Sequence, residues 1–263
     1  MIKFSIITVC LNAGNDLHDT VHSVLEQDYD NFEIIVKDGN SSDGSVEKLP
    51  ENNHHLQITR KADTGIYDAM NQGIDLATGD YLIFLNAGDK FPDKHSLTKI
   101  AECMKKSDVS LYYGRCYNET LKVNSNSPKN LTPFFCYRSM ICHQAMIFER
   151  EYLQQKKFDC HYKVSADKEI LMYTVVKEKL NTEYIPVIVA NYKGSGFSED
   201  EKNRKCIVSE VKQLQKQYFT PVQRFVYRFR IALTLPHIRK KIVGNPKLVR
   251  KYKKFVGMLY RNK

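Results

Sequence analysis

The sequence lacks the features that define several common classes of protein. No apolar run among its 263 residues approaches the ~20 residues that a membrane-spanning helix requires. The first residues, MIKFSIITV, are too short and too lightly charged to predict a signal peptide. The seven cysteines are odd in number and form no C-x-x-C pair, so we expect reduced thiols in a cytosolic compartment rather than a disulfide framework or a zinc site.

Glycine-rich phosphate-binding loops are also missing. The chain contains neither G-x-G-x-x-G nor G-x-x-x-x-G-K-[ST], the loops whose backbone amides hold the phosphates of dinucleotides and triphosphates. A nucleotide bound by this protein would therefore be held by side chains and a metal ion.

Acidic residues are absent from the C-terminal segment. Residues 220–263 hold 13 Lys and Arg and no Asp or Glu, whereas residues 1–219 hold 27 basic and 30 acidic groups. The formal net charge of +10 is thus concentrated at one end of the chain. We predict a near-neutral globular domain over residues 1–219, followed by a basic tail over residues 220–263.

Short apolar runs alternate with segments of helical spacing in the N-terminal part of the chain. Strands are predicted over residues 4–9, 32–36, 56–59 and 82–85, the first and the last of them buried. Apolar positions at helical spacing predict one helix from Leu17 and another from Ile66, and a short helix is expected over 45–49. This order predicts an α/β fold with a parallel sheet and right-handed crossovers.

Three of these strands run into loops that contain aspartate, namely Asp38, Asp63 and Asp89. The carboxyl ends of parallel strands open on one edge of the sheet, where α/β proteins bind ligands. Asp89 is placed to present an oxygen to a divalent cation, which would hold a substrate diphosphate. Because Asp is also common in turns, where it bonds to its own backbone, the pattern alone leaves a structural role open.

Four segments in order resemble the motifs of family 2 glycosyltransferases, in particular bacterial enzymes of exopolysaccharide and O-antigen assembly. These segments are SIITVCLN at 5–12, VKDGNSSDGS at 36–45, DTGIYDAMNQG at 63–73 and GDYLIFLNAGD at 79–89. The resemblance implies a GT-A fold, a Rossmann-like mixed sheet flanked by helices. It also implies a nucleotide-sugar-binding half over residues 1–90 and an acceptor half over residues 91–219.

The same resemblance implies a nucleotide-diphospho-sugar donor, expected to be a UDP-sugar, and Mn²⁺ or Mg²⁺ as cofactor. Asp89 would be the metal-binding last residue of the D-x-D motif. Asn86 occupies the first position of that motif, so Asp89 is its only carboxylate. The residues expected to bind the donor are Thr8, Cys10, Asn12, Asp38, Asp63, Asn71, Asn86, Ala87 and Gly88.

In the acceptor half, the resemblance places the catalytic base at Asp167, near the start of a predicted helix, with Glu169 as the alternative. Asp at a helix start is also a common cap, so a structural role remains open. His143 and Gln144 are expected near the site, His143 either as a metal ligand or as a hydrogen-bonded residue at a strand start. Lys193 would contact the diphosphate or lie in a solvated loop.

The rest of the acceptor half is predicted from periodicity. A helix is expected over 97–104, and strands are expected over 109–113, 145–148 and 184–190. The segment 115–139 is rich in Asn, Ser and Pro and is expected to be irregular. Acceptor specificity is expected to vary in this segment, because loops on a rigid scaffold carry recognition.

The resemblance implies an inverting, metal-dependent transfer of a hexosyl or N-acetylhexosaminyl group to a lipid-linked saccharide, in the synthesis of a cell-surface polysaccharide. The chain has no Trp, which excludes the Q-x-x-R-W motif of processive synthases, so one sugar per binding event is expected. A sugar-nucleotide pyrophosphorylase is an alternative, but residues 10–15 lack its Gly-rich, basic loop. A nucleic-acid-binding protein is another, but the tail contains no recognisable binding module.

The basic tail has amphipathic periodicity. Val222, Phe225, Val226, Phe229 and Leu233 recur at helical spacing among arginines, and residues 248–259 repeat the pattern among lysines. Basic amphipathic helices lie in the membrane interface with their apolar side down. We therefore expect residues 220–263 to bind an anionic membrane, which would place the enzyme peripherally on the inner face of the cell membrane. Packing of the tail on the globular domain is the alternative.

Overall fold

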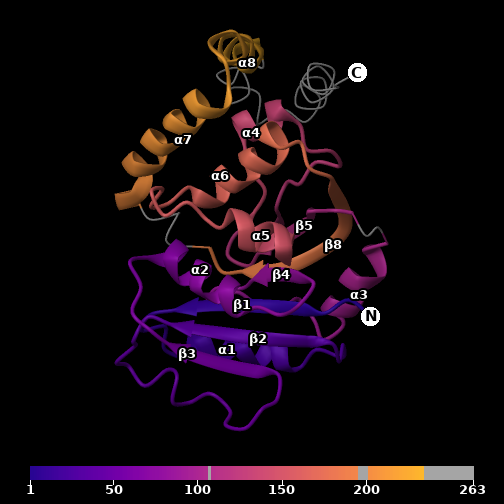
Figure 1. Cartoon of the computed structure of the whole chain (residues 1–263), viewed down its shortest axis with the longest axis vertical. Coiled ribbons are helices and arrows are strands. Elements are labelled where there is room, and N and C mark those ends of the chain that lie inside the picture. The colour runs from indigo at the N-terminus through magenta and orange to yellow at the C-terminus, as the bar shows by residue number, and fades with distance from the viewer. Residues whose placement is uncertain (106–107, 195–200, 234–263) are drawn as a thin grey trace. The chain divides into compact units, whose positions relative to one another are not determined.

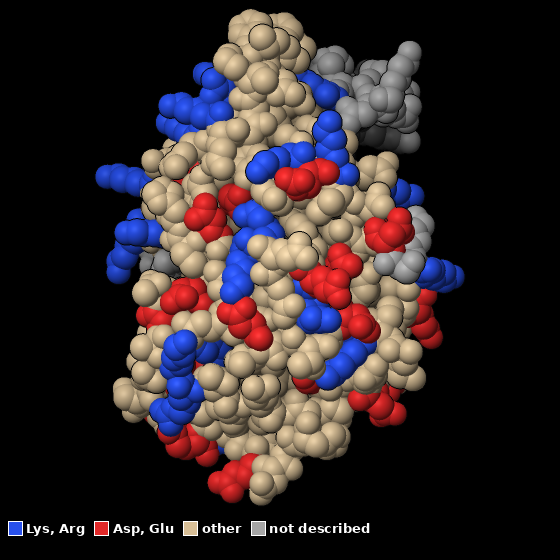
Figure 2. Space-filling view, viewed as in Figure 1, with Lys and Arg blue, Asp and Glu red and all other residues tan. Residues whose placement is uncertain are grey.

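The computed structural model describes residues 1–105, 108–194 and 201–233, and the chain divides into two compact units, Met1–Val211 and Lys212–Lys263. The first unit is built on an eight-stranded mixed sheet with the order β3-β2-β1-β4-β7-β5-β6, and β8 pairs with β5. Acidic and basic side chains are interspersed over its visible face (Figure 2).

The N-terminal half of the sheet is parallel. Its strands are β1 (Phe4–Cys10), β2 (Phe32–Asp38), β3 (Leu56–Arg60) and β4 (Tyr81–Phe84). Every residue of β1 and of β4 is buried, as expected for strands covered on both faces. The connecting helices α1 (Asn15–Leu25) and α2 (Ile66–Leu76) cover opposite faces of this part of the sheet (Figure 1). The parallel strands therefore end at one edge.

The acceptor half adds antiparallel pairing. β7 (Met146–Glu149) lies between β4 and β5 (Leu111–Asn118) and is antiparallel to both, whereas β8 (Thr182–Tyr192) is parallel to β5. The remaining elements are β6 (Val123–Asn124), α3 (Ser96–Cys103), α4 (Pro133–Arg138), α5 (Arg150–Lys156), α6 (Ala166–Met172) and α7 (Arg204–Tyr218). A 3₁₀ turn precedes β7 and a π-helical turn follows α6.

The predicted α/β class and mixed sheet are confirmed, and two local predictions are wrong. Residues 45–49 form a turn rather than a helix. There the Asp43 carboxylate accepts bonds from the backbone N and hydroxyl of Ser45, a local alternative to helical bonding. The segment 115–139 is not irregular throughout, because β5 extends to Asn118 and is followed by β6 and α4.

In the second unit, α8 (Pro221–Leu233) begins with a capping box. Thr220 Oγ1 accepts a bond from Gln223 N, and Gln223 Oε1 accepts one from Thr220 N. The predicted apolar residues lie on this helix and are exposed, Phe225 by 74% and Phe229 by 60%. No helix in the described part of the chain is long and apolar enough to span a membrane. The predicted second amphipathic stretch, 248–259, lies outside the described residues.

Helix α2 approaches strand β1 closely at Gly73. A Cβ built there would lie 2.6 Å from Ile7 Cγ2 on β1. We predict that Gly73→Ala lowers the free energy of unfolding by about 1–3 kcal/mol, because the added methyl group overpacks this contact. Helix propensity alone would raise it by about 1 kcal/mol. Urea unfolding measures the sign of the change, and a stabilised variant would contradict the tight contact.

Candidate functional site

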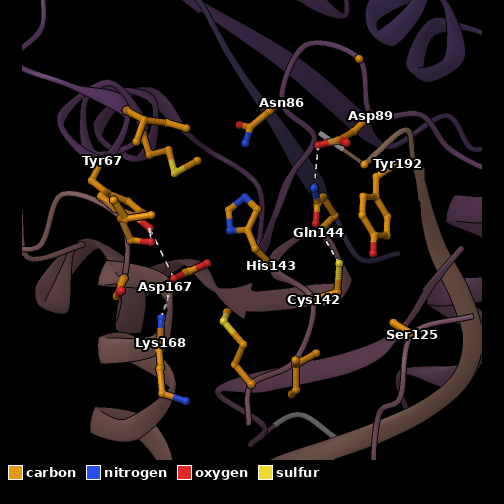
Figure 3. Close-up of a pocket in the computed structure, with 18 of the residues that line it drawn as sticks. Tyr67, Asn86, Asp89, Ser125, Cys142, His143, Gln144, Asp167, Lys168 and Tyr192 are labelled. Carbon is orange, nitrogen blue, oxygen red and sulfur yellow. Dashed lines mark hydrogen bonds between the residues drawn. The ribbon is translucent and has the colours of Figure 1, made fainter. Parts of the chain in front are cut away.

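One cavity of about 710 Å³ opens between the two halves of the first unit. Its walls come from the loop after β4, the 3₁₀ turn before β7, the start of α6 and the end of β8. In Figure 3, Asp89 and Asp167 lie on opposite sides of this cavity, and His143 lies between them. The sheet therefore brings two acids that are far apart in the sequence to the same cavity.

Asp89 lies in the tight loop after β4 and is 8% exposed. Its backbone N donates to Asn86 O at 2.9 Å, and Gln144 Nε2 donates to its Oδ2 at 2.9 Å. Gly88 permits this turn, because its φ of +99° lies in the left-handed region that favours glycine. Burial raises the pKa of Asp89 to about 7, since no Lys or Arg in the described residues pairs with it.

The oxygen atoms at this end of the cavity suit a divalent cation that also binds substrate. The described residues contain no group of three or more His, Cys, Asp or Glu side chains that could hold a metal ion. However, the Asn86 Oδ1 atom is buried without a hydrogen-bond partner beside the buried Asp89 carboxylate. Mg²⁺ and Mn²⁺ bind through one or two protein oxygens together with substrate phosphates, so these residues fit such an ion.

Asp167 lies in the first turn of α6, where Ser165 rather than Asp167 is the N-cap. Its Oδ1 accepts a bond from Lys168 N at 2.7 Å and lies 3.3 Å from the hydroxyl oxygen of Tyr67. The Tyr67 hydroxyl donates to Val164 O at 2.8 Å, which joins α2 to the segment before α6. Burial raises the pKa of Asp167 to about 6.

Glu169, the alternative base, does not line the cavity. It is 2% exposed, and its carboxylate pairs with Lys156 Nζ at 2.9 Å. Asn71, predicted near the donor, also lies outside the cavity wall. Its amide instead exchanges hydrogen bonds with the backbone N and O of Phe158.

His143 and Lys193 both line the cavity. Neither ring nitrogen of His143 has a hydrogen-bond partner, so the predicted hydrogen-bonded histidine at a strand start is not what the structure contains. Burial against Phe84 lowers the pKa of His143 to about 4, which makes the ring neutral. Lys193 pairs with Asp16, and this bond raises the pKa of the lysine.

The predicted nucleoside-binding residues form a second cluster, at the ends of β1, β2 and β3, that is not part of the cavity wall. Asp38 is fully buried and accepts bonds from Ser41 N and from Arg60 Nε at 3.1 Å. Asp63 pairs with Lys37 Nζ at 2.9 Å. The Thr8 hydroxyl is buried without a partner.

Two other members of this cluster have local partners. Cys10 Sγ donates to the Asp38 carboxylate at 3.6 Å, and burial raises the pKa of this thiol to about 12. Asn12 Oδ1 accepts a bond from Ser42 N at 2.9 Å. The structure thus divides the predicted donor residues into two groups. Asn86, Ala87 and Gly88 lie in the cavity wall with Asp89, and the strand-end residues lie apart from it.

Several cavity residues were not predicted from the sequence. No local pattern indicates Tyr67, because its hydroxyl contact to Asp167 joins residues 100 positions apart. The α7 helix contributes Ile207 and Val211. Between them, Glu210 accepts bonds from Lys163 N at 2.7 Å and Val164 N at 3.2 Å, which fixes the segment before α6. The mostly polar sequence of α7 gave only a weak helical pattern.

Comparisons with known proteins agree with this arrangement. The model of glycosyl transferase family 2 matches residues 5–168. A PGL/p-HBAD biosynthesis glycosyltransferase of Mycobacterium bovis is 32% identical over 199 residues, which are 73% of this chain and 77% of that protein. Of the classes that the sequence left open, these matches support the glycosyltransferase.

Solved structures agree on the fold at low identity. Mannosyltransferase PcManGT from Pyrobaculum calidifontis, in complex with GDP-Man and Mn²⁺, has a TM-score of 0.65 at 16% identity and covers 98% of this chain and 84% of its own. S. aureus TarS 1-349, in complex with UDP-GlcNAc, has a TM-score of 0.63 at 16% identity and covers 82% and 71%. The chain therefore belongs to glycosyl transferase family 2 and is a glycosyltransferase with the GT-A fold.

Proposed function

We propose that this glycosyltransferase moves one sugar from a nucleotide-diphospho-sugar to an acceptor hydroxyl, with inversion at the anomeric carbon. The observation that carries the proposal is a pair of carboxylates, the buried Asp89 and the partly exposed Asp167, on opposite sides of one cavity. Asp89 could help to hold a metal ion that binds the departing diphosphate. Asp167 could accept the proton of the attacking hydroxyl. A sugar bound between them would meet both groups at once.

The donor is assigned to the Asp89 side. Asp89 and Asn86 would hold Mn²⁺ or Mg²⁺, which when bound neutralises negative charge that develops on the diphosphate. Gln144 orients the Asp89 carboxylate through its side-chain amide. The strand-end cluster of Thr8, Asp38 and Asp63 is our proposed nucleoside site. We propose UDP as the nucleotide and a hexose or N-acetylhexosamine as the sugar.

Asp167 is the proposed base. Its carboxylate takes the proton from the acceptor hydroxyl as that oxygen forms a bond to the anomeric carbon. The bond from this carbon to the diphosphate oxygen breaks, and the nucleoside diphosphate leaves with the electron pair. A pKa of about 6 makes Asp167 an ionised yet competent base near neutral pH. This single displacement needs no covalent intermediate.

The acceptor is proposed to be a lipid-linked saccharide of a cell-surface polysaccharide, reached from the membrane surface. In the second unit, α8 combines exposed phenylalanines with Arg224, Arg228 and Arg230. Each Lys or Arg near anionic lipid contributes about 1 kcal/mol. We propose that the basic tail of residues 220–263 docks the enzyme peripherally on the inner face of the membrane.

Metal binding is tested without turnover by thermal unfolding. With UDP present, Mn²⁺ is expected to raise the melting temperature of the wild-type protein, because a ligand bound only by the native state stabilises it. Asp89→Asn is expected to remove this increase. Asp93→Asn is the matched control, since Asp93 pairs with Lys99 outside the cavity and the increase should remain. An undiminished increase in Asp89→Asn would assign the metal to other residues.

The base is tested by kinetics. Asp167→Asn is expected to retain donor binding and to lower kcat by about 10²–10⁴-fold, because the amide cannot accept the proton. Since burial raises the pKa of Asp167 to about 6, wild-type kcat/KM should fall as the pH drops below that value and the carboxylate becomes protonated. Glu169→Gln is the comparison. If it loses transfer while Asp167→Asn remains active, Glu169 is the base.

Membrane docking is tested by sedimentation with vesicles. Phe225→Ser with Phe229→Ser should weaken binding of the full chain to vesicles of anionic lipid, because the apolar face of α8 is lost. A chain that ends at Phe219 should bind still less, and neutral vesicles should bind all forms weakly. Val208→Ser, an exposed apolar residue on α7, is the control. Equal sedimentation of the full and shortened chains on anionic vesicles would remove the tail as the anchor.

A further inference from the structure

One part of the cavity wall is apolar and only half-buried. Ile207 and Val211 lie one turn apart on α7, and Ile66 starts α2. Each of the three retains accessible surface, and together they are called the apolar wall below. A ligand group that removes this surface from water gains free energy in proportion to the apolar area covered.

The apolar wall borders the Asp167 side of the cavity. Glu210 lies between Ile207 and Val211 in the sequence, and its carboxylate accepts a bond from Val164 N at 3.2 Å. The carbonyl oxygen of the same Val164 accepts the bond from Tyr67, whose hydroxyl oxygen lies 3.3 Å from Asp167 Oδ1. Asp89, in contrast, has Gln144 and the Asn86 backbone as its neighbours.

Two polar groups beside the apolar wall, the Tyr67 hydroxyl and the Glu210 carboxylate, are already engaged. The Tyr67 hydroxyl donates to Val164 O, and the Glu210 carboxylate accepts from two backbone amides. A sugar ring placed against the wall would exchange hydrogen bonds with water for contacts with aliphatic carbon, which costs free energy for each hydroxyl left without a partner. An aryl or alkyl group has no such groups to satisfy.

We propose that the apolar wall is an acceptor subsite for an aryl or alkyl group. The accepting hydroxyl is then carried by the sugar directly attached to that apolar group. An acceptor with a long saccharide between its reacting hydroxyl and its lipid would place a polar ring against the wall instead. The assignment of the acceptor to the Asp167 side rests on the proposed function.

The test compares matched acceptor fragments by direct binding. Phenyl and methyl β-glycosides of glucose, galactose, mannose and N-acetylglucosamine are titrated into the full chain, and Kd is measured by ligand-observed NMR. For at least one sugar, the phenyl glycoside is expected to bind about tenfold more tightly than its methyl partner, which corresponds to about 1.4 kcal/mol. Ile207→Ser with Val211→Ser should make the two Kd values equal.

Two further variants complete the comparison. Val208→Ser changes an apolar residue of the same helix that is 49% exposed and outside the cavity wall, and it should retain the phenyl preference. Ile207→Ala with Val211→Ala keeps the helix apolar and should give an intermediate preference, which covers the case in which the serine variant fails to fold.

Equal Kd values for phenyl and methyl glycosides of every sugar in the wild-type protein would overturn the proposal. So would a phenyl preference that persists unchanged in the serine and alanine variants. Binding is read without turnover, so failure of sugar transfer would count against the proposed function and not against the subsite. Preserved transfer activity with no phenyl preference would count against the subsite and not against the proposed function.

Discussion

The site depends on two carboxylates that make no ion pair with a basic side chain in the part of the chain that the structure describes. Asp89 and Asp167 both have pKa values raised by burial, to about 7 and about 6. A buried carboxylate without a counter-charge is costly, and the cost is offset where a ligand supplies positive charge or a proton. This constraint explains why one acid suits a metal-bound diphosphate and the other suits proton transfer.

The arrangement is made by contacts between the two halves of the first unit. Gln144, just before β7, bonds to Asp89, and Tyr67 on α2 bonds to Val164 just before α6. The pairing of β7 with β4 brings the start of β7 beside the loop that holds Asp89. Asp89 and Asp167 thus line the same cavity, and neither half alone contains both acids.

Sequence periodicity predicted the parallel strands well because β1 and β4 are buried on both faces and leave uniform apolar runs. Contacts between residues far apart in the sequence were harder to predict. The extension of β5 to Asn118 depends on β8, and the contact of Tyr67 with Asp167 spans 100 positions, which no local pattern records. Glu210 was missed for the same reason. It is a buried acid in a mostly polar helix, and its partners are backbone amides near residue 163. The prediction of a helix over 45–49 failed because the Asp43 carboxylate bonds to Ser45 and competes with helical hydrogen bonding.

The central claim is a single displacement in which Asp167 takes the proton and no covalent intermediate forms. The most direct test is the anomeric configuration of the first product, followed by proton NMR during transfer from a nucleotide-sugar of known configuration. The account predicts that the new glycosidic bond has the configuration opposite to that of the donor. A product with the donor's configuration would contradict it, because retention requires a second displacement or attack from the side of the leaving group.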